Sequence, residues 1–134
     1  MTTRKNKPRA KPKPHVFVIS DPIFITDHLI CCGTTYRFAF DRFKRLLEKQ
    51  KYTLTLTFED VRSTTMGRST MSGHKPTCLW FRDRTPGGGV VAHECLHATY
   101  NVLGLSGVSL SDSSEETYAY YLDWMVREIG KRVW

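Results

Sequence analysis

Two histidines and a glutamate stand at a spacing that could perform metal chemistry. His93 and His97 are four residues apart, so on a helix their imidazoles lie one turn apart on the same face, where both can bind a single zinc ion. Glu94 lies beside them. A carboxylate near the metal that is not needed as a ligand can accept a proton from activated water and pass it to a leaving group. The pattern His-Glu-x-x-His therefore predicts a hydrolytic zinc site with Glu94 as general base.

A catalytic zinc ion takes three protein ligands and leaves one position for water, so a third ligand is needed. None of the five histidines follows His97, which makes a downstream third ligand a carboxylate. The candidates are Asp112, Glu115, Glu116, Asp123 and Glu128. Helical periodicity places Glu115 at the centre of the apolar stripe of the last predicted helix and Glu116 at its edge. An upstream cysteine, Cys78, is a further alternative.

The segments around the motif resemble a known family. Residues 93–98, 103–105 and 114–122 are similar to the small zincin-like peptidases encoded by tailed bacteriophages, and the resemblance spans about residues 77–126. It implies a zinc metallopeptidase of the gluzincin type, whose third ligand is a glutamate on the next helix. The spacing of Glu116 and Ala119 resembles the Glu-x-x-small pattern of gluzincin ligand helices, which favours Glu116 over Glu115.

The elements that must position this site predict an α+β fold. Five stretches show strand patterns: 15–19, 23–25, 29–32, 51–58 and 77–81. Residues 62–76 are rich in Ser, Thr and Gly and indicate a long loop or an irregular edge strand that could border a substrate cleft. We expect 77–81 to be an edge strand that binds an extended peptide by strand addition.

Three helices are expected to pack on this small twisted sheet: 36–50, the active-site helix 90–103, and a helix from about 111 to 130 that bears the ligand glutamate. Thr34 is the expected cap of the first helix, and Gly104 the expected end of the second. The third is expected to begin with a capping box, formed by Asp112 with Glu115 or by Ser113 with Glu116. Together these elements predict a single zincin-like domain over residues 15–134.

The positive charge of the chain is concentrated at its start. The formal net charge is +7, and six basic residues with no acid lie among the first fourteen, interleaved with prolines. This composition predicts a disordered basic tail over residues 1–14, able to make at most weak, nonspecific contact with nucleic acid. There is neither a signal peptide nor a window of about 20 apolar residues. We therefore expect a cytoplasmic protein without membrane contact, in the host cytoplasm if a phage encodes it.

Two further alternatives remain open at this stage. The zinc site could stabilise a non-catalytic module that binds a host protein, although the intact Glu94 favours an enzyme because a structural site does not need it. Tyr100, Tyr120 and His74 could each stabilise an oxyanion, although packing or solvation is the simpler interpretation of each.

Overall fold

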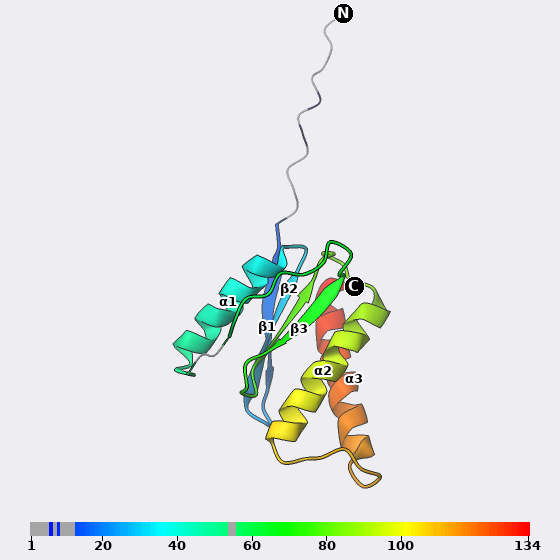
Figure 1. The fold of residues 1–134 in the computed structure, drawn as a ribbon. Helices are drawn as coiled ribbons and strands as arrows, with labels where there is room; N and C mark the ends of the chain where they lie inside the picture. Colours follow the sequence, from blue (N-terminus) through cyan, green and yellow to red (C-terminus); the bar gives the residue numbers. More distant parts are fainter. Residues whose placement is uncertain (1–5, 7, 9–12, 54–55) are drawn as a thin grey trace, which may run out of the picture.

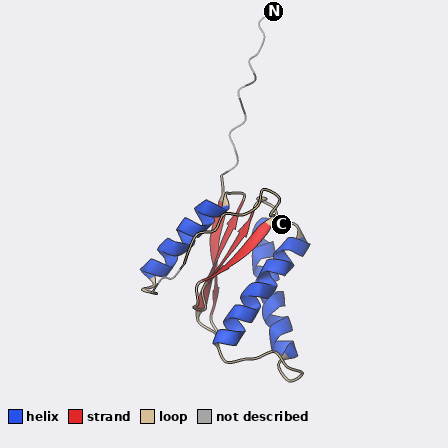
Figure 2. Ribbon diagram, viewed as in Figure 1, coloured by secondary structure: helices blue, strands red, loops and turns tan. Residues whose placement is uncertain are grey.

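The chain forms a four-stranded sheet with one helix on one face and two helices on the other (Figure 1, Figure 2). The structure is a computed structural model that describes residues 13–53 and 56–134, together with Asn6 and Pro8. Within these residues the elements are β1 (His15–Asp21), β2 (Thr26–Cys32), α1 (Tyr36–Lys49), β3 (Gly67–Met71), β4 (Thr77–Phe81), α2 (Gly88–Leu105) and α3 (Glu115–Val133). The expected α+β class is confirmed. Most of the predicted basic tail lies outside the described residues.

The sheet has the strand order β1-β2-β4-β3, with β2 and β4 parallel at its centre and the outer strands antiparallel to them. All five residues of β4 are buried, whereas β3 is polar and lies at the edge. A strand covered on both faces is apolar throughout, and an edge strand tolerates polar side chains. The prediction that 77–81 forms the edge is therefore wrong. The edge strand lies within 62–76, as one of the two alternatives for that stretch expected, but it pairs with β4 in regular register.

Two hydrophobic clusters lie on opposite faces of the sheet. Phe43 and Trp80 belong to the cluster under α1, while Leu79 and Val91 belong to the cluster under α2 and α3. The alternation of side chains along β2 places Cys31 in the first cluster and its neighbour Cys32 in the second. All four cysteines are buried and free.

Two of the predicted strands form no strand in the residues that the structure describes. Residues 23–25 form the turn between β1 and β2, because the Asp21 carboxylate accepts a hydrogen bond from the Ile23 backbone N–H at 2.7 Å and closes the chain there. The described part of 51–58 does not join the sheet either; its Leu54 and Thr55 lie outside the described residues. Phe58 instead packs against Phe40 with ring centroids 5.4 Å apart. In the described part of 51–58, the alternation therefore reflects Tyr52, Leu56 and Phe58, which are partly buried against the hydrophobic cluster under α1, rather than strand pairing.

The ends of the helices also differ from expectation. Thr35, not Thr34, caps α1, since its hydroxyl accepts a hydrogen bond from the Phe38 N–H at 3.1 Å. The helix α2 runs through Gly104 and is terminated by Gly107, whose positive φ of 81° only glycine adopts easily. Ser114 precedes α3 without a side-chain cap, so neither predicted capping box forms.

A buried polar cluster joins the sheet to α3. His28 Nδ1 lies 2.7 Å from the Thr77 hydroxyl, and its Nε2 lies 2.8 Å from the Tyr121 hydroxyl. Burial lowers the pKa of His28 from 6.5 to about 4, although the nearby carboxylates of Asp21 and Asp27 act in the opposite direction. His28 is therefore neutral at physiological pH.

None of the helices in the described part of the chain is both long enough and apolar enough to cross a membrane.

Candidate metal site

The helix α2 displays both histidines because its other faces are occupied. Val91, Cys95 and Ala98 are fully buried against the sheet, as their helical spacing predicts. His93 and His97 consequently lie on the solvent side of the same helix and are exposed. Cys95, within the motif, is a core residue, and burial raises its thiol pKa to about 12.

The two imidazoles approach each other closely enough to share a metal ion. Their Nε2 atoms lie 3.3 Å apart, and the ring centroids are separated by 5.0 Å. Two nitrogens that bind one zinc ion at about 2.05 Å with a tetrahedral angle stand about 3.3 Å apart. The separation of the two nitrogens therefore matches the distance expected for two histidine ligands of one zinc ion.

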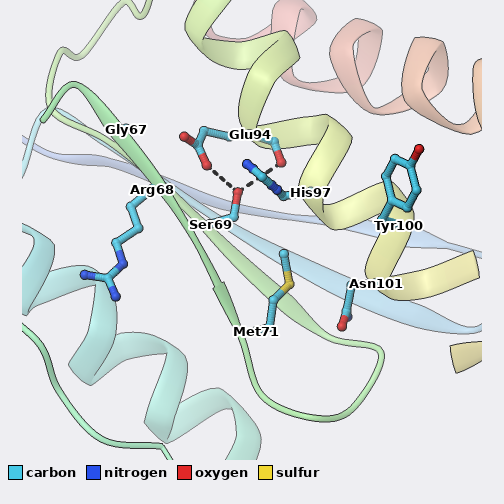
Figure 3. A pocket seen from close by; sticks show the side chains of 8 residues that line it. All are labelled: Gly67, Arg68, Ser69, Met71, Glu94, His97, Tyr100 and Asn101. Carbon is cyan, nitrogen blue, oxygen red and sulfur yellow. Dashed lines mark hydrogen bonds between the residues drawn. The ribbon is translucent and has the colours of Figure 1, made fainter. Parts of the chain in front are cut away.

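Glu94 is held at the junction of α2 and the edge strand β3. Its side chain is only 7% exposed. The Ser69 hydroxyl lies within hydrogen-bond distance of Glu94 Oε2 and also of the Glu94 backbone oxygen, at 3.0 Å (Figure 3). Oε1 has no hydrogen-bond partner among the described residues. One oxygen of this carboxylate is thus fixed by the protein, and the other remains available as a proton acceptor.

A cleft runs along the junction between β3 and α2. It has a volume of about 560 Å³, and its lining includes Ser69, Glu94 and His97 (Figure 3). A second hollow of about 310 Å³ adjoins it and is lined in part by Gly67, Glu94 and His93. A Cβ atom at Gly67 would lie only 2.9 Å from the Val90 side chain, so the lack of a side chain allows β3 to approach α2 here. The motif residues therefore border one open groove beside an edge strand.

Glu116 does not lie next to the two histidines. It is exposed in the first turn of α3. The rings of Tyr118 and Tyr100 pack with centroids 5.1 Å apart, and Tyr100 lies almost one turn beyond His97 toward the end of α2. Because α3 runs antiparallel to α2 (Figure 1), Glu116 is displaced still farther from the histidines. In the described part of the chain, no three side chains of His, Cys, Asp or Glu are grouped closely enough to hold a metal ion.

The other carboxylate candidates for the third ligand also face solvent. Glu115 and Asp112 are exposed at the start of α3 and in the loop before it. Asp123 pairs with Arg127 at 3.0 Å, and Glu128 pairs with a lysine one turn later. The identity of the third ligand stays a prediction.

The positions of the remaining ligand and oxyanion candidates decide which of them can belong to the site. Cys78 is buried in the cluster under α1, on the face of the sheet opposite to α2, and cannot join the histidines. Tyr100 lines the cleft. Tyr120 is 71% exposed and does not line it, and His74 packs on Tyr52 with centroids 4.5 Å apart. Tyr100 is thus the one of the three oxyanion candidates that borders the cleft.

Sequence reasoning missed the residues of β3 that complete the site. Ser69 holds Glu94, and Gly67 permits the close approach of the strand. Asn101, which also lines the cleft, donates a hydrogen bond to the His74 backbone oxygen at 3.0 Å and ties α2 to the loop after β3. The only signal for Ser69 and Gly67 was their place in a polar stretch expected to border a cleft.

Comparisons of the chain with protein-family models, curated proteins and solved structures give no match. The features that indicate a function are therefore the motif and its geometry.

Proposed function

We propose that this protein is a zinc-dependent metallopeptidase in which His93 and His97 hold the metal and Glu94 is the general base. The observation that supports this most directly is the 3.3 Å separation of the two Nε2 atoms beside a buried carboxylate in an open cleft. Zinc, when bound, acidifies a water ligand and polarises a carbonyl group. The remaining steps fall to the side chains of the protein.

Glu94 is the proton carrier in this proposal. Its free Oε1 accepts the proton of the attacking water and delivers it to the nitrogen of the leaving amine. The hydrogen bond from Ser69 to Oε2 keeps the carboxylate in one orientation, so that it does not have to be ordered during the reaction.

The edge strand β3 is the proposed binding site for the substrate backbone. It pairs with β4 on one side only, and it borders the cleft through Gly67, Ser69 and Met71. An extended peptide can hydrogen-bond to the unpaired edge of such a strand, which would place its backbone next to Glu94. This role replaces the one expected for 77–81.

Glu116 remains the proposed third ligand, which requires the first turn of α3 to move relative to α2 when zinc binds. The zinc affinities of Glu116→Gln and Glu115→Gln, measured by competition with a chelator, test this assignment. We expect the affinity to fall in Glu116→Gln and to stay unchanged in Glu115→Gln. The reverse order would transfer the role to Glu115.

Cleavage of a proteome-derived peptide library by the zinc-loaded protein tests the enzymatic activity, with Glu94→Gln as the matched control. This variant keeps the size and the histidines of the site but cannot accept the proton. We expect cleavage to fall by about 10²- to 10⁴-fold in Glu94→Gln while zinc is retained. Equal cleavage by both proteins would contradict the role of Glu94. Bound zinc without any cleavage would favour the non-catalytic zinc-stabilised module.

A further inference from the structure

The outer face of α1 carries an excess of basic side chains. Between residues 36 and 51 the chain has six basic and two acidic residues. Arg42, Arg45 and Lys49 recur at the spacing of one helix face, and all three are exposed. Within the described residues none of these three side chains takes part in an ion pair. We call these three residues the α1 stripe; it is about 10 Å long, at 1.5 Å per residue.

The rest of the folded part has the opposite charge. Outside residues 36–51, residues 15–134 contain eight basic and eleven acidic residues, a net charge of −3. Among the described helices α1 is the one on its face of the sheet, while α2 and α3, which carry most of the acids of the last third of the chain, lie on the other face (Figure 2). Residues 15–134 as a whole carry a net charge of only +1, but this nearly neutral sum combines a basic side and an acidic side.

The basic N-terminal segment joins the chain next to this basic side. His15 at the start of β1 pairs with Cys32, and α1 begins four residues after Cys32. Six further basic residues precede His15 in the sequence. Their attachment point is thus close to the start of α1, about 9 Å along the helix from the first residue of the α1 stripe, so both can contact one extended polyanion.

We infer that the α1 stripe binds double-stranded DNA through its phosphates, independently of the cleft between β3 and α2. Duplex DNA carries one negative charge per about 1.7 Å of its axis, so the stripe spans about six phosphates. An anionic membrane is the less suitable partner, because a surface helix binds lipid by inserting apolar side chains. On α1 no large apolar side chain is exposed, and Arg42 covers the ring of Phe38 at 5.6 Å. Contacts to phosphates alone imply binding without sequence preference.

The salt dependence of DNA binding by the full chain tests this inference. Affinity for a 30-base-pair duplex is measured by fluorescence anisotropy over a range of salt concentrations, for the wild type and two triple variants. The first variant combines Arg42→Gln, Arg45→Gln and Lys49→Gln. The matched control combines Arg127→Gln, Lys131→Gln and Arg132→Gln on α3, which removes the same charge and the same residue types from the opposite face.

Loss of three phosphate contacts makes the slope of log affinity against log salt concentration less negative by about 3. We expect this change in the α1 variant and a slope within about one unit of wild type in the α3 variant. Equal slopes in the two variants would assign all binding to the N-terminal segment or to net charge, and would overturn the inference. Undiminished binding of the α1 variant to DNA, or binding of the wild type to phosphatidylserine vesicles but not to DNA, would also overturn it.

Discussion

Acidification is expected to destabilise this protein through His28, which has no exposed surface and lies between Thr77 and Tyr121. Burial lowers its pKa from 6.5 in an unfolded chain to about 4 in the folded protein. The unfolded state therefore binds a proton at a higher pH than the folded state does. The stability that depends on neutral His28 is complete above pH 6.5 and is lost as the pH falls toward 4.

The size of the loss follows from the difference between the two pKa values. Each pKa unit corresponds to about 1.4 kcal/mol, so the shift of His28 amounts to about 3 kcal/mol once the pH reaches 4. At pH 5 about 2 kcal/mol of this is already lost. Since small proteins are stable by only about 5–15 kcal/mol, the loss is a substantial part of the whole.

Urea unfolding at pH 7, 5 and 4 measures this effect when the wild type is compared with His28→Gln. Glutamine does not titrate, so the wild type is expected to lose about 3 kcal/mol more than His28→Gln between pH 7 and 4. His74→Gln removes a histidine outside this cluster and is expected to keep the acid sensitivity of the wild type. If wild type and His28→Gln lose the same free energy, His28 does not have a lowered pKa in the folded protein, and the carboxylates of Asp21 and Asp27 outweigh its burial.

The edge strand β3 allows two further tests of the site. Ser69→Ala removes the hydroxyl that bonds the buried carboxylate of Glu94, and is expected to lower the free energy of unfolding by about 1–3 kcal/mol in urea; an unchanged midpoint would mean that water replaces the hydroxyl. Gly67→Ala places a Cβ atom 2.9 Å from the Val90 side chain and is expected to destabilise the protein by about 1–3 kcal/mol, measured as a lower melting temperature. A melting temperature equal to that of wild type would show that the Val90 side chain can turn away.

Local spacing made the histidine pair predictable. Residues four apart on a helix are neighbours whatever the rest of the fold does, so the short distance between His93 and His97 follows once α2 forms. The buried face of α2 was predictable for the same reason, because Val91, Cys95 and Ala98 share one helical face. These features depend on a few consecutive residues and on one regular element.

The third ligand could not be located in the same way. Its position depends on how far α3 is shifted along α2, and the loop before α3 and the packing of Tyr118 on Tyr100 determine that shift. The sequence distance between His97 and Glu116 carries no information about the conformation of this loop. An identification by spacing alone therefore remains a prediction until the ligand is measured.

The order of the strands in the sheet also could not be predicted from local sequence patterns. The alternation of 51–58 indicated a strand, but Phe58 satisfies it by packing on α1. The short polar segment of β3 gave little strand signal, although it pairs with β4 over five residues. Ser69 cannot be identified from the sequence, because a serine in a polar stretch has no distinguishing pattern and its role arises only from the contact with Glu94.

The zinc content of the purified, tag-free protein, determined by elemental mass spectrometry, tests the central proposal most directly. Wild type and Glu94→Gln are each expected to contain about one zinc ion per chain after reconstitution, and His97→Ala is expected to contain none. Absence of zinc from the reconstituted wild type, or full retention of zinc by His97→Ala, would contradict a metal site built on the histidine pair.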